Sequence, residues 1–193
     1  RQYPMTLAET ASIFSQFIIF KEALESATGD ERLALVEGFL QDSTQVCVDI
    51  LSRFYFEKEL FAKRAEGDLM PGELCSMMVN AQKRAYGEAL DEQYLHPYMW
   101  AVKGHYYSSN FSFYNYPYAF GQLFGLGVYT LAQNNGDFGK HYDELLRSTG
   151  MDNAQNVGAT VGCKIDESAF WEQSLELIGS YVDEFCQLCE AKE

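Results

Sequence analysis

One histidine is followed by a dense run of aromatic residues in the middle of the sequence. The stretch GHYYSSNFSFYNYPYAFG, residues 104–121, holds His105 and eight aromatic side chains in eighteen residues. Glycine precedes the histidine and the helical period is lost at this point, so the backbone can display side chains to a cleft. A histidine in such a place can donate a hydrogen bond to a substrate carbonyl. The stretch is therefore a candidate substrate-binding wall.

The tyrosines of this stretch offer phenol hydroxyls as further hydrogen-bond donors. Tyr114, Tyr116 and Tyr118 occupy alternate positions, which would place their hydroxyls on one side of an extended segment. Phe111, Phe113 and Phe120 in the same stretch can only pack. Because aromatic clusters usually belong to a hydrophobic core, composition alone favours packing over a binding role.

A carboxylate near the start of the sequence is the second unusual feature. Glu9 precedes Ile13 by one helical turn and is close in angle to Phe20, on the side that should face the core. A buried carboxylate is costly unless a cation, a metal ion or strong donors meet it. Taken alone, Glu9 is more simply explained by a position at the rim of the apolar stripe, or by pairing with a lysine or arginine.

The other histidines and the cysteines give weaker signals. No two of the three histidines stand at the i, i+4 spacing that places two zinc ligands on one helical face, and His96 and His141 are typical of surface or capping residues. Cys186 and Cys189 form a single C-x-x-C in a predicted terminal helix, where two half-buried thiols are favoured over redox or zinc use. No G-x-S-x-G elbow occurs, so nucleophilic catalysis has little support.

Composition excludes some classes of partner. The net charge of −14 would repel nucleic-acid phosphates and anionic lipid headgroups, so neither nucleic acid nor a membrane surface is expected as a partner. No apolar run approaches the roughly 20 residues that a bilayer span needs. Five cysteines, an odd number, suggest reduced thiols and a cytoplasmic location.

The hydrophobic period predicts an all-α protein whose helices position these residues. We expect a single helical unit over residues 1–193, with about six or seven helices and an irregular Tyr-rich loop near 98–116. The helices are predicted over 5–27, 28–65, 73–92, 117–133, 138–147, 152–161 and 167–191. The apolar stripe of the long second helix is predicted to comprise Leu33, Val36, Leu40, Cys47, Leu51 and Phe54.

Three segments together resemble a known family. YPMTLAETASIF, GHYYSSNFSFYNYPYAFGQLFGLGVY and LLRSTGMDNAQNVGATVGCKIDESAFWEQSLELI are similar to the C-terminal part of oligoendopeptidase F, in the thimet-oligopeptidase-like class of zinc metallopeptidases. The similarity covers nearly the whole chain. It implies a zincin-like C-terminal helical lobe that belongs to a larger peptidase catalytic domain.

The resemblance also implies roles for individual residues. In this family one zinc ion is held by the two histidines of an H-E-x-x-H helix and by a glutamate on a following helix. LAETAS matches the segment that carries this glutamate, which assigns the metal ligand to Glu9. The family's substrate-binding and oxyanion-stabilising histidine and tyrosine map onto His105 and Tyr114. Tyr116 is the next candidate and Tyr118 is possible, because the spacing from the histidine varies among relatives.

The sequence departs from the family at one decisive point. H-E-x-x-H does not occur in these 193 residues, so two zinc ligands and the glutamate that acts as general base are missing. We therefore expect a truncated chain or a proteolytic remnant of an enzyme that hydrolyses short peptides, inactive on its own. Its expected partners are short peptide substrates, the missing N-terminal part of the same enzyme, and other copies that associate through the face left uncovered.

Two functions from other classes stay open at this stage. The chain could be a non-catalytic helical interaction domain whose aromatic segment forms a partner-binding groove, in which case no H-E-x-x-H would precede it in the gene. It could also be a complete small hydrolase that uses His105 with a carboxylate, in which case peptide cleavage would be insensitive to a chelator.

Overall fold

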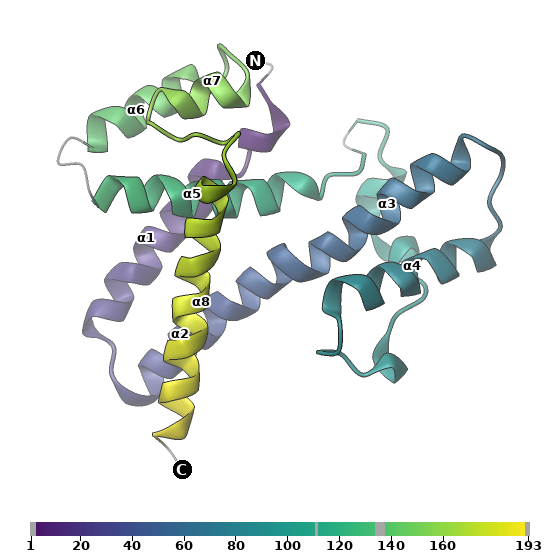
Figure 1. Ribbon diagram of the computed structural model, residues 1–193, viewed down its shortest axis with the longest axis horizontal. Coiled ribbons are helices and arrows are strands. Elements are labelled where there is room, and N and C mark those ends of the chain that lie inside the picture. The colour runs from purple at the N-terminus through teal and green to yellow at the C-terminus, as the bar shows by residue number, and fades with distance from the viewer. Residues whose placement is uncertain (1–2, 111, 134–137, 192–193) are drawn as a thin grey trace. The chain divides into compact units, whose positions relative to one another are not determined.

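The described chain is built of helices joined by turns and loops, as the computed structural model in Figure 1 shows for residues 3–110, 112–133 and 138–191. Within these ranges there are eight α-helices and no strand, which confirms the predicted all-α class. The α-helices are α1 (Thr10–Ser26), α2 (Gly29–Thr44), α3 (Ile50–Arg64), α4 (Pro71–Tyr86), α5 (Tyr116–Gln133), α6 (Phe138–Ser148), α7 (Ala154–Ala159) and α8 (Ser168–Glu190). Short 3-10 turns occur at η1 (Met5–Leu7), η3 (Glu92–Tyr94), η4 (Met99–Val102) and η5 (Gly104–Tyr107).

The long helix predicted over 28–65 is interrupted. The predicted number of helices, about six or seven, is therefore too low, and the predicted apolar stripe of this helix is not continuous. A π-helical segment, Gln45–Asp49, separates α2 from α3. A π turn adds a residue to the helical repeat, so the face that continues into α3 is rotated relative to a regular helix. In α3 Phe54 is 45% exposed, whereas Ser52 and Arg53 are buried, because α3 packs against α4 within unit 2 and not as a continuation of the α2 stripe.

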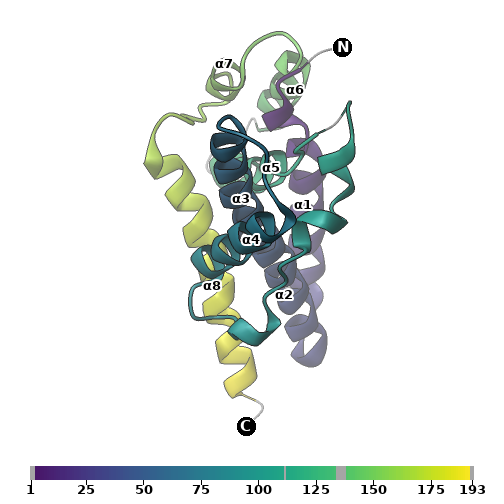
Figure 2. The same cartoon turned by 90° about the vertical axis from the view of Figure 1, so that its right-hand side faces the viewer.

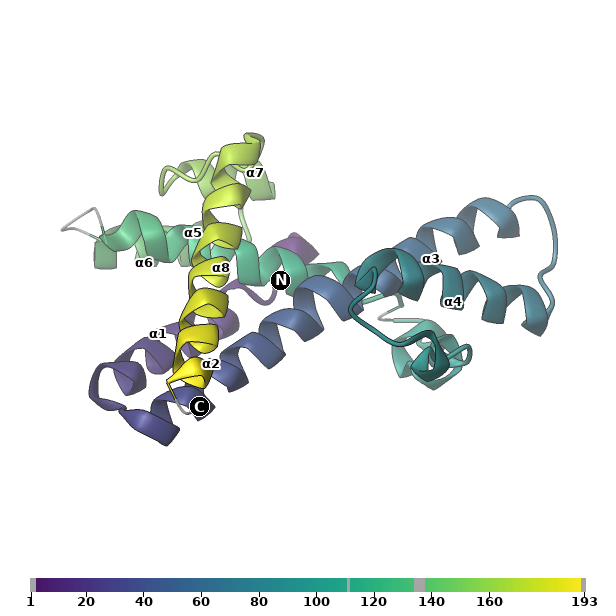
Figure 3. The same cartoon turned by 60° about the horizontal axis from the view of Figure 1, so that its bottom comes forward.

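The chain forms two compact units, unit 1 (Arg1–Ser43 and Pro117–Glu193) and unit 2 (Thr44–Tyr116). Since two such units can belong to one domain, the single-domain organisation stays a prediction. In unit 1, α1 and α8 both cross α5 (Figures 1 and 3). α8 packs closely on α5, as shown by the hydrogen bond that the Ser174 hydroxyl donates to the Leu123 carbonyl oxygen at 2.6 Å. The core of unit 1 is built from buried side chains that include Phe14, Phe17, Val36, Phe124, Leu126, Val128 and Phe170.

Unit 2 is centred on the pair α3 and α4, which lie side by side in Figure 2. Its core consists of Phe56, Met77, Met78 and Ala81. α4 begins with Pro71 in its first turn and ends at Tyr86, earlier than the predicted residue 92. It ends there because Gly87 adopts a positive φ of 58°, which glycine tolerates best.

The remaining boundaries are close to the predicted ones. The Tyr-rich loop predicted near 98–116 contains η4 and η5, and α5 begins with Pro117 in its first turn, as expected for proline. α6, α7 and α8 correspond to the last three predicted helices, and Glu167 is the residue at the N-cap of α8. None of the helices in the described ranges has the length and apolar character required to cross a membrane.

Candidate functional site

His105 lies in η5 of unit 2 and is half-buried. Its Nδ1 atom is buried and has no hydrogen-bond partner among the described residues. Burial lowers the pKa of the imidazole, and the positive charges of Arg53 and Lys103 lower it further. The ring is therefore held in its neutral form, which has one N–H to donate and one nitrogen to accept.

The backbone brings His105 to the tyrosine segment. The N–H of Phe113 donates to the His105 carbonyl at 3.3 Å, which closes the loop between these two residues. Phe113 adopts a positive φ of 57°, a conformation that is rare for an aromatic residue and costs about 1–3 kcal/mol. Its ring compensates by packing on Tyr106 and Phe61, with centroids 5.2 and 4.7 Å away. Tyr114 follows Phe113 directly, so its backbone belongs to the turn that this hydrogen bond closes.

The three candidate tyrosines differ in their surroundings. Tyr114 is half-buried, whereas Tyr116, the first residue of α5, is 45% exposed. Tyr118 is half-buried and lies in unit 1, while the other two lie in unit 2. The structure thus places Tyr114 and Tyr116 in the same unit as His105. Which hydroxyl contacts a substrate stays a prediction.

Glu9 stands just before α1, and not inside a helix as the sequence pattern predicted. It is half-buried, and the Ser12 hydroxyl is 3.0 Å from both its Oε2 atom and its carbonyl oxygen. α5 passes close to it at Gly121. Glu9 is thus fixed by α1 on one side and by α5 on the other.

A complete metal site is not found in the described ranges. The residues there contain no group of three or more histidine, cysteine, aspartate or glutamate side chains that could hold a metal ion. Glu9 belongs to unit 1 and His105 to unit 2, and the prediction that both face one cleft stays a prediction.

A buried polar cluster on α3 is the part of the site that the sequence analysis missed. Asp49, Arg53 and Glu57 are one turn apart, and each is less than a tenth exposed. Arg53 pairs with Asp49 through Nη2, and its Nη1 donates to Asn115 at 3.3 Å. The Asn115 amide in turn donates to Glu57. A chain of partners thus runs from Asp49 through Arg53 and Asn115 to Glu57, and Asn115 lies between Tyr114 and Tyr116 in the sequence.

Tyrosines surround both ends of this cluster. The Tyr86 hydroxyl donates to Asp49 at 2.9 Å, and burial together with this carboxylate raises the pKa of Tyr86 to about 12. The phenol of Tyr106 is buried near Glu57, and burial is also the main reason that the pKa of Glu57 is raised. Both phenols therefore stay protonated at neutral pH.

The spacing of the acidic and basic residues was the signal that could have revealed the cluster. Asp49, Arg53 and Glu57 stand at i, i+4 and i+8, so they share one face of a helix. On a regular helix this face would lie outside the predicted stripe. The burial of this face was not predicted because its partners in unit 2, Asn115 and Tyr86, are far away in the sequence.

The structure also shows where His96 and the two cysteines of the C-x-x-C lie. His96 is tied into unit 2 by its backbone, because its N–H donates to the buried Gln82 side chain at 2.9 Å, and its Nδ1 caps the N–H of Tyr98 at 3.1 Å. This is the capping role expected for it. Cys186 and Cys189 lie on α8 as free thiols, the first exposed and the second half-buried.

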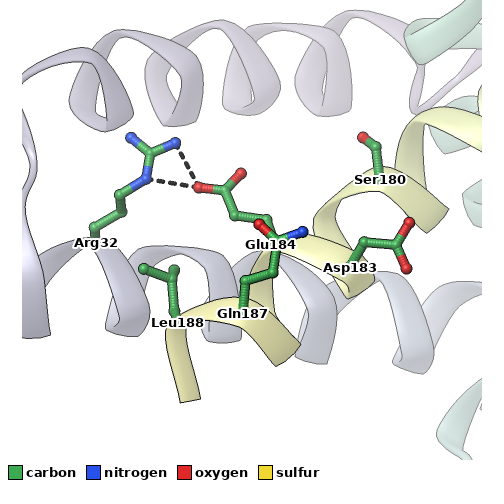
Figure 4. A pocket seen from close by; sticks show the side chains of 6 residues that line it. All are labelled: Arg32, Ser180, Asp183, Glu184, Gln187 and Leu188. Carbon is green, nitrogen blue, oxygen red and sulfur yellow. Dashed lines mark hydrogen bonds and ion pairs between the residues drawn. The ribbon is translucent and has the colours of Figure 1, made fainter. Parts of the chain in front are cut away.

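A separate cavity of about 440 Å³ lies between α2 and α8 of unit 1 (Figure 4). It is lined by Arg32, Ser180, Asp183, Glu184, Gln187 and Leu188. Arg32 points toward Glu184 and donates to its carboxylate through Nε at 2.6 Å, while Nη1 donates to the Leu24 carbonyl at 2.8 Å. Arg32 therefore serves to link α2 to α8, and none of the candidate catalytic residues lines this cavity.

Two solved structures share this fold. One is an oligoendopeptidase-F from Enterococcus faecium, with a TM-score of 0.83 and 17% identity over 98% of this chain. The other is described as a "putative peptidase" from Chlamydophila abortus, with a TM-score of 0.83 and 23% identity over 97% of this chain. This chain spans about a third of each of those proteins, 36% and 31% of their lengths respectively.

Comparisons by sequence did not identify a family for this chain. No family model matches the chain, and no curated protein matches it. At these levels of identity the structural likeness establishes the fold, which is that of one part of known peptidase structures.

Proposed function

We propose that this chain forms part of a zinc-dependent endopeptidase that hydrolyses short peptides. The observation that carries the proposal is the match of nearly the whole chain to one part of an oligoendopeptidase-F structure. The fold alone does not define an activity, because one fold can host several functions. The arrangement of His105 and the tyrosine segment supplies the second, chemical argument.

His105 and Tyr114 are proposed to donate hydrogen bonds to the substrate carbonyl and to the oxyanion that develops from it. Donors that are fixed in advance contribute most when charge develops in a partly desolvated site. Two features support this role for His105: burial and nearby cations keep the imidazole neutral, and the bond to Phe113 fixes its backbone. Tyr116, which is more exposed, is the second candidate for the phenol donor.

Glu9 is proposed as one zinc ligand. A single carboxylate does not hold zinc, and the described residues offer no further group of ligands, so the remaining ligands would come from sequence outside this chain. When bound, zinc would supply a water of lowered pKa and polarise the scissile carbonyl. The contribution of this chain is to hold the Glu9 carboxylate in place between Ser12 and α5.

Hydrolysis of a quenched-fluorescent peptide of about ten residues by the complete protein tests this proposal. We expect cleavage that 1,10-phenanthroline abolishes and that added zinc restores, and no cleavage by residues 1–193 alone. Glu9→Gln should lower zinc content and activity together. Cleavage that persists in the presence of the chelator would contradict a metallopeptidase and favour the metal-free hydrolase.

The gene itself provides an independent check. An H-E-x-x-H sequence should lie upstream of residue 1, on a helix that precedes the Glu9 segment. If no such motif is encoded there and no peptide is cleaved, a non-catalytic interaction domain would be the better description.

A further inference from the structure

Asn115 occupies an unusual position within the tyrosine segment. Its side chain is 1% exposed, although Tyr116 beside it is 45% exposed. Its backbone N–H donates to the Phe113 carbonyl at 3.0 Å, so the residue is part of the same tight turn that bonds to His105. The segment therefore directs one amide into unit 2 and carries a tyrosine on each side of it.

The partners of this amide are matched to its two ends. Its Nδ2 group donates to the Glu57 carboxylate, and its Oδ1 atom accepts from Arg53 at 3.3 Å. Glu57 and Arg53 stand one turn apart on α3, so the amide bridges two fixed points on a single helix. Arg53 is itself fixed on its far side by Asp49.

Only an amide satisfies both partners. A carboxylate at position 115 would repel Glu57, and an apolar side chain would deprive two buried charged groups of a hydrogen-bond partner each, which is costly. Any shift of the segment along α3 would break both hydrogen bonds at once. The register of residues 113–116 is thus set by two directional contacts in addition to apolar packing.

We infer that Asn115, Arg53 and Glu57 are positioning residues that hold Tyr114 and Tyr116 in the orientation used for substrate binding. This inference rests on the proposed peptidase function. The three side chains act through the tyrosines and need not touch the substrate. Because a misplacement of about 1 Å can cost on the order of 100-fold in rate, loss of this anchor should lower kcat more than it raises KM.

A pair of isosteric substitutions that exchanges the amide and the carboxylate tests the inference. Asn115→Asp removes the donor and places two carboxyl groups together, whereas the added change Glu57→Gln restores a donor on the other side. In the double variant the new glutamine amide on α3 would donate to the new aspartate in the tyrosine segment. Arg53 would still be paired, and the total charge would equal that of the natural sequence. Shape is nearly unchanged throughout, so the cycle isolates the hydrogen bonds.

Gln82 provides a matched control in the same unit. It is also a 1% exposed amide, and it ties the backbone of His96 to α4, away from the tyrosine segment. Gln82→Glu changes a buried amide to a carboxyl in the same way as Asn115→Asp. Loss of stability alone should therefore affect both variants, whereas loss of tyrosine positioning should affect only the Asn115 variant.

Two measurements on the complete protein separate this inference from the proposed function. Peptidase kinetics should show kcat reduced about 10- to 100-fold in Asn115→Asp, with KM changed less, and recovery in the double variant. Hydrogen exchange of the amides of Phe113 and Asn115 should accelerate at least about 10-fold in Asn115→Asp and recover in the double variant. The control should leave both readouts near those of the natural protein.

The outcomes are distinct. A natural protein without peptidase activity would sink the proposed function, and the exchange data would then still decide whether the anchor holds the segment. Unchanged exchange at Phe113 and Asn115, or a loss of kcat no larger than that of the control, would overturn the inference even in an active peptidase. Failure of Glu57→Gln to rescue Asn115→Asp would do the same.

Discussion

Gly121 on α5 lies directly against Glu9. A methyl group added at Gly121 would be 2.9 Å from the Cβ of Glu9 and 3.0 Å from its carbonyl carbon, closer than packed side chains tolerate. α5 can pass Glu9 at this distance only because residue 121 has no side chain. Since the obstructing atoms belong to the backbone and to Cβ, Glu9 could not rotate away. The candidate zinc ligand is thus positioned by a glycine on another helix.

Gly121→Ala should therefore displace Glu9. We expect a loss of roughly 1–3 kcal/mol in the free energy of unfolding, because overpacking forces a backbone shift. In the complete protein we also expect weaker zinc binding. Gly179→Ala is the matched control, since it lies inside α8 with open space around it and should be neutral or stabilise by up to about 1 kcal/mol. Equal effects of the two substitutions, by chemical denaturation and zinc titration, would contradict the proposed packing.

Tyr114→Phe tests the proposed donor without removing the ring. Loss of one oxyanion donor typically lowers kcat about 10²- to 10³-fold. We expect a loss of this order in the complete protein, with KM changed little, because the interaction strengthens in the transition state. Tyr107→Phe is the control, as Tyr107 lies in the same segment and is 65% exposed. If Tyr114→Phe keeps normal kcat while Tyr116→Phe loses it, the donor role belongs to Tyr116.

The sequence was a good guide to the class of fold and to the position of the irregular segment near residues 98–116, since both depend on local patterns. Helical periodicity and turn residues predict most of the elements, and Pro117 marks the start of α5 correctly. The helix predicted to reach residue 92 ends at Tyr86 because Gly87 adopts a positive φ. That glycine could have been recognised as a helix stop.

The buried cluster was not predictable from the same patterns. A constant helical period places Phe54 inside and Arg53 outside, whereas in the fold Arg53 is buried and Phe54 is 45% exposed, because α3 packs against α4 within unit 2. Asn115 gave no signal of its own, because its partners Arg53 and Glu57 are far away in the sequence. Contacts of this kind depend on tertiary packing and require the structure.

His105 should titrate below the usual histidine range. The unperturbed pKa of histidine is about 6.5, and burial, then Arg53 and then Lys103 lower it in the fold. An NMR titration of the imidazole Hε1 signal should show a midpoint below that value. Lys103→Met removes one of the two positive charges and should raise the midpoint. A midpoint at or above about 6.5 would show that the ring is not held neutral.

The same shift makes stability depend on pH. Because the folded pKa of His105 lies below the unfolded one, the unfolded chain binds more protons between the two values. The contribution of His105 to stability is therefore complete above about pH 6.5 and is lost as pH falls toward the folded pKa. His105→Gln should remove this part of the pH dependence. Denaturant unfolding of both proteins across this range measures the difference.

Glu57 should affect the pH dependence of stability in the opposite direction to His105. Burial raises the pKa of its carboxyl, although Tyr106, Asn115 and Arg53 partly offset the shift. The folded state therefore holds its proton to higher pH than the unfolded chain, whose glutamate pKa is about 4.3. Stability should fall as pH rises from that value through the folded pKa, and level off above it.

Glu57→Gln isolates this contribution, because glutamine cannot ionise and its carbonyl can still accept from Asn115. Below about pH 4 ionisation of residue 57 should contribute little to any difference in stability between the natural protein and the variant, since both side chains are neutral. As pH rises, the variant should gain in relative stability until the natural carboxyl is fully ionised.

Glu59→Gln is the control, because Glu59 is a more exposed residue on the same helix and pairs with Lys63. Urea unfolding at a series of pH values measures the difference, and a variant whose relative stability falls with pH would show that Arg53 and Asn115 outweigh the cost of burial.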